Sequence, residues 1–382
     1  MAARGMSGTI REALERGGGI FRLAPCWVPR PANVPGGRLK LHPHDLYVFG
    51  AHRGGIDERW LASVTKADNG PGTLEDEGMS YIECPGGQRV PLGDVIQELG
   101  EAWDVLGKFF DNQTPIAHHM HQDAVHAARV GRKPKPEAYY FPPQLNLVEH
   151  GFPYSFLGLT PGTTPAEVRS CLERWHAGDN GILNLSQAYK LQTGTGWQIN
   201  PGILHAPGSL VTYEVQGASD VGAVFQSLVN GRPMPWSALV KDVPAEHAGD
   251  LDYIVGMLDW EANVNHHFAA RNRRLPKVCS ESDQYMEKWI VYGAPWYSGK
   301  ELTVHPGRSV TIRDQGSYGM VLVQGHGTVG AHAAETPSMI RFGQMTQDEF
   351  FVTAQAAREG VRVTNASDRE DLVALKHFGP TQ

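Results

Sequence analysis

The sequence predicts a mainly β fold with two β-barrels and a few inserted and connecting helices. Glycine and proline are abundant, at 44 and 26 of 382 residues, and both are spread along the whole chain. Turn-forming residues at this density are typical of many short strands. In the last third of the chain, short apolar segments recur about every ten residues, which indicates a β-barrel or sandwich. A set of histidines and a glutamate between residues 119 and 205 suits a metal centre inside a barrel.

Composition narrows the expected partners. The formal net charge is −7 and no basic segment stands out, so nucleic acid is not an expected partner. Residues 1–19 lack the apolar core of a signal peptide, and no segment approaches the ~18 apolar residues of a membrane span. We therefore expect a cytoplasmic protein with no membrane partner, and leave open whether it forms homo-oligomers. The four cysteines are isolated, as expected for reduced thiols: Cys26, Cys84, Cys171 and Cys279.

Helix and strand signals alternate in the first half of the chain. Thr9 and Glu12 have the spacing of a capping box, which predicts a short helix that ends at Gly17. Strands are expected over 46–49, 60–64 and 79–82. Apolar residues at helical spacing predict one helix over 92–110. The clearest helix signal is Thr164-Pro165-Ala166-Glu167, where a cap, a first-turn proline and a capping-box glutamate predict a helix to residue 177.

The second half repeats the strand pattern after a charged, helical connector at about 250–274. Segments of alternating apolar residues predict strands of a second barrel over 309–313, 318–324, 350–353, 361–364 and 372–375. This region has no His-x-His pair. We expect it to bind no metal.

The candidate metal ligands begin with His119 and His121. Residues i and i+2 of a strand project from the same face, so this pair can bind one ion, whereas the adjacent His118 must face the other way. His42 and His44 have the same spacing, but the intervening proline suits an edge or a turn. A substrate-facing loop or plain surface is the preferred interpretation there.

With Lys135-Pro136-Glu137 and Leu204-His205-Ala206, these residues resemble the type I mannose-6-phosphate isomerases, which are zinc-dependent cupins. Glu214 and the segment Ala218-Ser219-Asp220 continue the resemblance. It implies a bicupin, with a helical segment at 1–19, a catalytic barrel at 20–240, a connector at 241–283 and a metal-free barrel at 284–382.

The resemblance also implies a ligand set and a reaction. One divalent ion would be held by His119, His121, Glu137 and His205. Zinc is expected first, although manganese, iron, cobalt and nickel also suit such ligands. The expected reaction is aldose–ketose isomerisation of a sugar or sugar phosphate. Its proton transfers are assigned to the catalytic residues Lys135 and Glu214, and its substrate contacts to three residues: Tyr139, Trp197 and Asp220.

Two departures from the family pattern keep other functions open. The usual first ligand is glutamine where this chain has His119, and a three-His, one-Glu set also suits an iron-dependent cupin oxygenase or other oxidoreductase. The arginine expected soon after Ser219-Asp220 falls on Val224, and the next arginine is Arg232. A carbohydrate-binding cupin without catalytic activity is therefore a further hypothesis.

Overall fold

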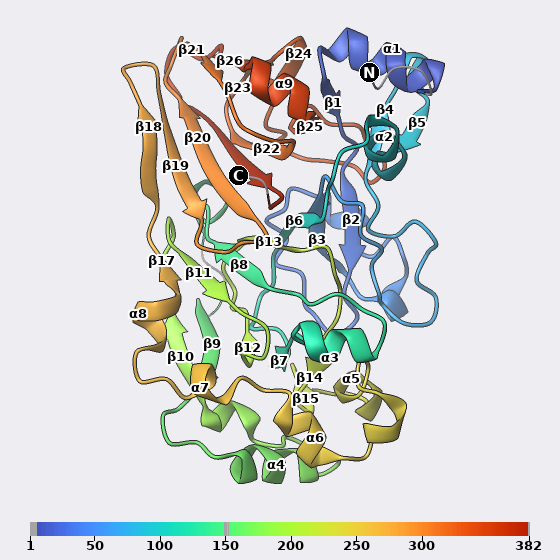
Figure 1. Ribbon diagram of the computed structural model, residues 1–382, viewed down its shortest axis with the longest axis vertical. Coiled ribbons are helices and arrows are strands. Elements are labelled where there is room, and N and C mark those ends of the chain that lie inside the picture. Colours follow the sequence, from blue (N-terminus) through green and yellow to red (C-terminus); the bar gives the residue numbers. More distant parts are fainter. Residues whose placement is uncertain (1–5, 149–150, 152, 381–382) are drawn as a thin grey trace.

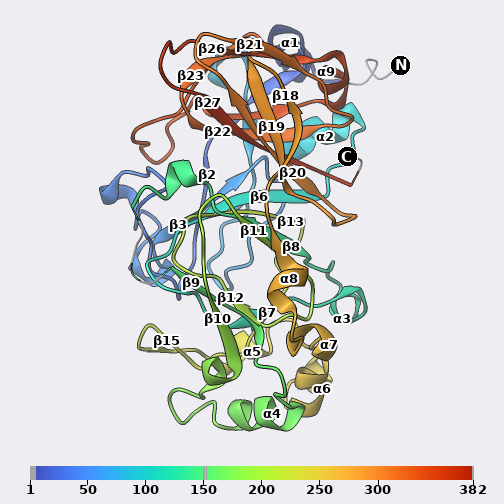
Figure 2. The ribbon, with the colours of Figure 1, turned by 90° about the vertical axis from the view of Figure 1, so that its left-hand side faces the viewer.

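The computed structural model describes residues 6–148, 151 and 153–380, and its strands group into two units stacked along the long axis of the molecule (Figure 1). We call them the first and the second β-unit. Turning the molecule by 90° shows the same stacking, with the helices that follow the first β-unit at the opposite end from the N-terminus (Figure 2). The molecule is mainly β, as the sequence predicts.

The first β-unit consists of a seven-stranded and a five-stranded sheet. The seven-stranded sheet has the order β17 (Arg273–Arg274), β11 (Gly196–Ile199), β8 (Glu137–Tyr140), β13 (Thr212–Gly217), β6 (Val105–Phe110), β3 (Ile56–Leu61) and β2 (Cys26–Pro29). The five-stranded sheet has the order β10 (Ser186–Lys190), β9 (Tyr154–Leu159), β12 (His205–Ala206), β7 (His119–Met120) and β14 (Ala223–Val224).

The second β-unit also has two sheets. The larger has the order β1 (Ile20–Arg22), β25 (Glu349–Val352), β22 (Tyr318–Gln324), β27 (Leu372–Phe378), β20 (Ser298–Val304), β19 (Tyr285–Val291) and β18 (Lys277–Glu281). The smaller has the order β21 (Ser309–Ile312), β26 (Val361–Asn365), β23 (His326–Val329) and β24 (His332–Glu335). All five strands predicted beyond residue 300 are confirmed. Among the described residues the sheets of both units are open, so the closed barrels predicted from the sequence are not confirmed.

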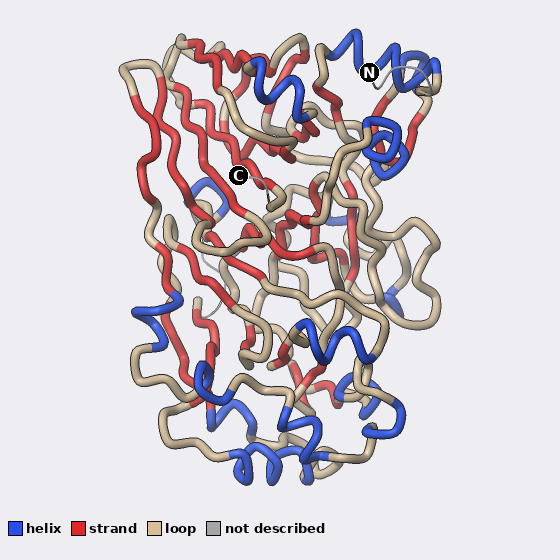
Figure 3. Tube along the Cα trace, viewed as in Figure 1, coloured by secondary structure: helices blue, strands red, loops and turns tan. Residues whose placement is uncertain are grey.

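The remaining elements are short. Two hairpins pair β4 (Tyr81–Glu83) with β5 (Arg89–Pro91), and β15 (Leu228–Val229) with β16 (Arg232–Pro233). Figure 3 shows that helices gather at one end of the first β-unit and beside the N-terminus. The helices are α1 (Gly8–Gly17), α2 (Leu92–Leu99), α3 (Ala124–Arg129), α4 (Pro165–Glu173), α5 (Trp236–Leu239), α6 (Leu251–Gly256), α7 (Trp260–Asn263), α8 (Phe268–Asn272) and α9 (Ala354–Glu359). None of these helices is long and apolar enough to cross a membrane.

The capping signals were largely correct. Thr164 and Glu167 form the predicted capping box of α4, although the helix ends at Glu173 rather than at residue 177. Helix α1 is present, but its cap is Ser7, whose side chain accepts a hydrogen bond from the Ile10 amide, and not Thr9.

Two predicted elements are wrong. The helix expected over 92–110 is two elements, because α2 ends at Gly100 in the left-handed conformation, with φ of 67°, and the chain continues into β6. Glycine adopts this conformation at little cost, so it ends the helix. The strand expected over 46–49 is a series of turns that follows a 3₁₀ turn at Pro43–Asp45.

A large apolar core lies where the two β-units meet. It combines Tyr213 and Val215 of β13 with Phe351 of β25 and Leu375 of β27. A separate apolar core fills the second β-unit, and another lies beneath helix α4. The seven-stranded sheet of the first β-unit therefore has one face on the second unit and the other toward its own five-stranded sheet.

Candidate metal centre

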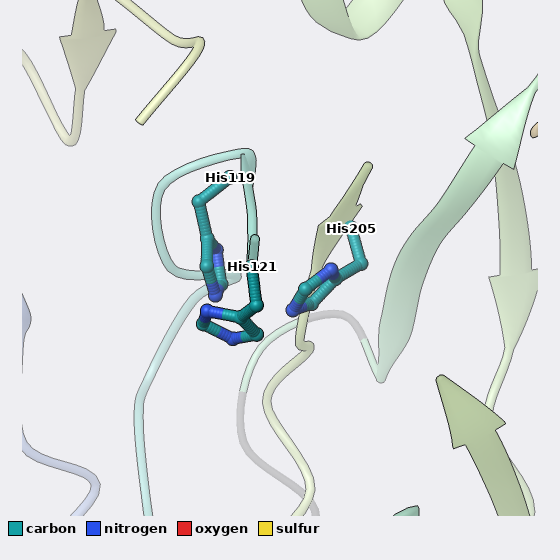
Figure 4. Close-up of side chains that lie close together, drawn as sticks. All are labelled: His119, His121 and His205. Atoms are coloured by element: carbon teal, nitrogen blue, oxygen red, sulfur yellow. The ribbon is translucent and has the colours of Figure 1, made fainter. Parts of the chain in front are cut away.

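Three histidines meet on two neighbouring strands of the five-stranded sheet (Figure 4). His119 of β7 is paired directly with His205 of β12, and His121 follows β7. The ring centroids of His119 and His205 are 4.1 Å apart, and that of His121 lies 4.9 Å and 5.1 Å from them. One nitrogen from each ring lies within 4.8 Å of the other two, and within the described residues no other group of three potential ligands meets in this way.

Backbone carbonyls orient all three rings. In each ring Nδ1 lies at hydrogen-bond distance from a carbonyl oxygen, and since a carbonyl only accepts, Nδ1 carries a proton, which in the neutral ring leaves the lone pair on Nε2. The contacts are 2.7 Å from His119 to Ala117, 2.7 Å from His121 to Val221 and 2.8 Å from His205 to Ile203. The histidines are therefore held in the tautomer that binds a metal through Nε2.

The environment of the rings favours the neutral form that a metal ligand requires. Burial, reinforced by Lys135, lowers the pKa of His121 to about 4. Burial and the neighbouring His205 lower the pKa of His119 well below its usual value. His118 faces away from the cluster, as predicted, and its Nε2 lies 2.8 Å from the Ser186 hydroxyl.

Glu137 lies beside the three rings. Its carboxylate oxygens lie 3.0 Å from Nε2 of His205 and 3.1 Å from Nε2 of His121, and the Tyr139 hydroxyl donates to Oε1. Although burial alone would raise the pKa of Glu137, Lys135 and His121 hold it well below its usual range, so the group is a carboxylate.

The contact between His205 and Glu137 tests whether the residues fit a metal ion. Nε2 of His205 is buried and makes no hydrogen bond, and the atom that faces it at 3.0 Å is a carboxylate oxygen, which only accepts. The contact is favourable when this nitrogen carries a proton or when a cation lies between the two groups. Three imidazole Nε2 atoms and a carboxylate are also a ligand set that divalent zinc accepts. The four predicted ligands fit a metal ion.

A chain of alternating charges extends from the histidines across the seven-stranded sheet. Lys135 Nζ lies 3.1 Å from Glu137 Oε2 and 3.5 Å from Glu214 Oε1. Lys108 Nζ lies 3.4 Å from Glu214 Oε2 and 3.3 Å from Glu58 Oε1. All of these side chains are buried, and buried charges persist only where they are paired. The chain therefore couples the two predicted catalytic residues to each other and to Glu137.

Glu214 is the member of this chain best suited to exchange a proton at neutral pH. Burial and the nearby charge of Glu137 raise its pKa to about 8, against the opposing effect of Lys108 and Lys135. Its Oε1 atom makes no hydrogen bond. A general acid or base works best with a pKa near the working pH.

The chain ends at Arg30, which the sequence did not single out. Arg30 Nε lies 3.1 Å from Glu58, and its two terminal nitrogens lie 3.1 Å from the two oxygens of Asp220. Both carboxylate oxygens of Asp220 are therefore paired with Arg30. This ion pair holds the pKa of Asp220 well below its usual value despite burial. Lys108 was also missed, because the segment around it was read as a helix. The strand alternation of β6, which places Lys108 and Phe110 on one face, was the signal that would have identified it.

Of the other residues singled out in the sequence, some lie beside the histidines and one lies in the apolar core. Tyr139 contacts Glu137, as described. Trp197 is buried in an apolar cluster, stacked on Phe268 with ring centroids 6.4 Å apart, so it is part of the core. Val224 lies opposite His119 in the ladder of β7 and β14.

The fold is that of known sugar-phosphate enzymes. No protein-family model matches the sequence, and no curated protein is similar to it. Mannose 6-phosphate isomerase from Bacillus subtilis superposes with a TM-score of 0.63 at 15% identity, covering 94% of this chain and 99% of that one. The chain has the fold of the mannose 6-phosphate isomerases.

Two further structures of this fold also superpose over nearly the whole of both chains. A variant of phosphomannose isomerase from Salmonella typhimurium has a TM-score of 0.59 at 12% identity, over 95% of this chain and 100% of that one. A mannose 6-phosphate isomerase bound with zinc and yttrium has a TM-score of 0.59 at 12% identity, over 94% and 99%. The resemblance seen in the sequence motifs is therefore confirmed by the fold of nearly the whole chain.

Proposed function

We propose that this protein is a metal-dependent aldose–ketose isomerase acting on a small carbohydrate. The observation that carries the proposal is the cluster of His119, His121 and His205, in which one nitrogen of each ring lies within 4.8 Å of the others, with the Glu137 carboxylate 3.0 Å from His205 Nε2 and in contact with Lys135. His119, His121, Glu137 and His205 would hold one divalent ion, with zinc as the first candidate because a zinc-bound isomerase shares the fold.

The reaction moves a proton between two neighbouring carbons of the sugar. A bound metal ion would polarise the carbonyl and hydroxyl oxygens of the substrate. Glu214 is placed to take and return the carbon-bound proton, since its Oε1 is free of hydrogen bonds and its pKa is raised to about 8. Lys135, 3.5 Å away, stabilises the carboxylate form and is the alternative proton carrier. Tyr139 orients Glu137.

We further propose that the preferred substrate is a neutral sugar rather than a sugar phosphate. Among the described residues, the three cations of the charge chain, two of them buried and Arg30 half-buried, all have carboxylate partners: Arg30 with Glu58 and Asp220, Lys108 with Glu58 and Glu214, and Lys135 with Glu137 and Glu214. A phosphate would have to displace a carboxylate from one of them. Val224, opposite His119, offers no charge-assisted contact.

The test combines elemental analysis of the purified protein with an isomerisation screen of free and phosphorylated aldoses and ketoses. We expect one divalent metal per chain and turnover of a free sugar at a higher kcat/KM than mannose 6-phosphate. Faster turnover of mannose 6-phosphate would refute the neutral substrate, and the absence of any isomerisation by the metal-loaded protein would refute the reaction.

The catalytic roles are tested by Glu214→Gln and Lys135→Met. Each should lower kcat by roughly 10²–10⁴-fold with the metal retained, as expected for the loss of a general acid or base. Lys133→Met is the matched control, because Lys133 is two residues away but exposed and paired only with Asp104. Unchanged turnover in both site variants would refute the assignment.

The three-His, one-Glu set keeps an iron-dependent oxidoreductase as the second candidate. It predicts iron in the purified protein together with substrate-dependent oxygen consumption, and an isomerase does not consume oxygen. At the level of architecture, we propose that the two β-units are cupin-type barrels. The catalytic region is 20–240, apart from β1 (Ile20–Arg22), which pairs with β25 of the second unit, and the metal-free region is 284–382. The four unpaired cysteines support the cytoplasmic location expected from the sequence.

A further inference from the structure

Successive side chains in the seven-stranded sheet of the first β-unit point alternately to its two faces, one toward the metal centre and one toward the second β-unit. In β8, Glu137 and Tyr139 face the metal centre, whereas Tyr140 lies in the core between the units. In β13, Glu214 faces the charge chain and Tyr213 the core between the units. This follows from the two-residue period of a strand. Tyr139 and Glu214 therefore each have an immediate chain neighbour, Tyr140 and Tyr213, that points at the second β-unit.

These neighbours make buried polar contacts with the second β-unit. The Tyr213 hydroxyl lies 2.9 Å from Nδ1 of His377. The Tyr140 hydroxyl donates to Glu301 Oε2 at 2.7 Å. Both contacts join side chains that are at most 3% exposed, where an unmade hydrogen bond costs most.

A third contact reaches the backbone of a predicted ligand. Gln198 of β11 donates through Nε2 to the Tyr297 hydroxyl at 2.9 Å and to the Glu137 carbonyl oxygen at 3.1 Å. Tyr297 belongs to the segment just before β20 and is 1% exposed. Through Gln198, a residue of the second β-unit is thus two hydrogen bonds from the main chain of Glu137.

His377 fits closely between the two units. A Cβ added at Gly107 of β6 would lie 2.6 Å from the His377 ring, and one added at Gly319 of β22 would lie 2.3 Å from it. Only glycine allows backbones to approach a ring this closely. Gly107 directly precedes Lys108, so the ring is packed against the strand that carries another member of the charge chain.

We propose that the second β-unit is the positioning element of the metal centre, with His377, Glu301 and Tyr297 as its positioning residues. They hold the strands that carry Glu214 and Glu137 from behind: His377 contacts the chain neighbour of Glu214, Glu301 contacts the chain neighbour of Tyr139, and Tyr297 acts through Gln198. A site must be held to about half an ångström to function, and groups outside the ligand shell typically change metal affinity or activity by 10–100-fold. The kinetic part of this inference rests on the proposed isomerase function; the metal-binding part does not.

Three substitutions that each delete one buried hydroxyl test the proposal in the full chain: Tyr140→Phe, Tyr213→Phe and Tyr297→Phe. The control is Tyr318→Phe, a buried tyrosine whose ring packs in the second unit's own core. For every variant we would measure zinc affinity by chelator competition, the visible absorption spectrum of the cobalt-loaded protein, kcat and KM, and the melting temperature.

Some variants should change zinc affinity and the cobalt spectrum, and others should change kcat. Tyr140→Phe and Tyr297→Phe, which release the strands around Glu137, should weaken zinc affinity by about 10–100-fold and shift the cobalt spectrum. Tyr213→Phe should lower kcat by about 10–100-fold with zinc affinity and KM nearly unchanged, because β13 carries Glu214 but no ligand. Combining Tyr213→Phe with His377→Phe should cost no more than the worse single variant, since both remove one contact. Glu301→Gln keeps an acceptor for Tyr140 and should retain zinc affinity.

A purely structural role gives a different result. If the three site variants lower the melting temperature while zinc affinity, the cobalt spectrum and kcat all match the Tyr318→Phe control, the positioning proposal is wrong. If the unmodified protein isomerises no sugar, the proposed function fails instead, and the zinc and cobalt measurements still decide the positioning proposal.

Discussion

Both β-units bury charged side chains, but they arrange them differently. In the second β-unit, two lysines and two carboxylates form a closed quartet with N–O distances from 2.5 to 3.2 Å: Lys300 and Lys376 with Glu287 and Asp314. Every lysine faces both carboxylates, so donors meet acceptors throughout. In the first β-unit, the chain of charges ends at Glu137, whose carboxylate lies 3.0 Å from Nε2 of His205 and 3.1 Å from Nε2 of His121. Lys135 Nζ also lies 3.1 Å from Nε2 of His121.

The two arrangements of buried charge differ in whether the protein alone balances them. A balanced quartet needs no further ligand, because each charge already has its counter-charge in the protein. Three imidazoles that meet beside a carboxylate, by contrast, could hold a metal ion, which is why we propose the metal site in the first β-unit. The histidines of the second unit do not meet in this way, as far as the described residues go.

The sharpest test of this comparison is removal of one imidazole from the first β-unit. His121→Ala and His205→Ala should each abolish stoichiometric metal binding, because the remaining ligands no longer enclose an ion. The control is His326→Ala, an exposed histidine of the second unit, which should retain one metal per chain. Elemental analysis after dialysis gives the result, and full metal occupancy in the His121 variant would contradict the assigned site.

Substitution in the lysine–carboxylate quartet of the second β-unit should lower stability and leave metal binding unchanged. Lys376→Met leaves two buried carboxylates with one lysine, and breaking a buried ion pair in this way costs roughly 3–5 kcal/mol in the free energy of unfolding. Metal content should stay at the wild-type value. Urea unfolding measures the loss, with the exposed Lys277→Met as a control that should change stability by no more than about 0.5 kcal/mol. A loss of metal together with normal stability would reverse the roles of the two units.

Features of the fold and of the candidate site could be predicted from the sequence where the interacting residues lie close together in the chain, and not where they lie far apart. Helix α4 was predicted because its cap, proline and glutamate lie within four residues of one another. The candidate ligands could be proposed from the sequence because each lies in a short motif. Arg30, Glu58 and Lys108 were missed because only the pairing of β2, β3 and β6 brings them beside Glu214. No local pattern encodes which strands become neighbours, and the contacts between the units, such as Tyr213 with His377, depend on the same long-range pairing.

The smallest expected effect concerns the surface where the two units meet. Arg59 of β3 reaches across it to both oxygens of Asp348, at 2.8 and 2.9 Å, and to Glu349 Oε2 at 2.9 Å. Glu349 is fully buried, and burial, reinforced by Asp348, raises its pKa to about 7 although Arg59 acts against the shift.

A carboxyl group whose pKa is higher in the folded chain than in the unfolded chain stabilises the fold in its protonated form. This contribution is complete below about pH 4.5 and is lost as the pH rises through about 7. At 1.36 kcal/mol per pKa unit the loss is on the order of 3 kcal/mol. Glu349→Gln keeps the shape without the charge and should remove this decline. The free energy of unfolding measured in urea at pH 5 and pH 8 gives the comparison, with the exposed Glu261→Gln as a control that retains the wild-type decline. An equal decline in the Glu349 variant would show that this carboxylate is ionised at the interface throughout the range, and that Arg59 neutralises both acids.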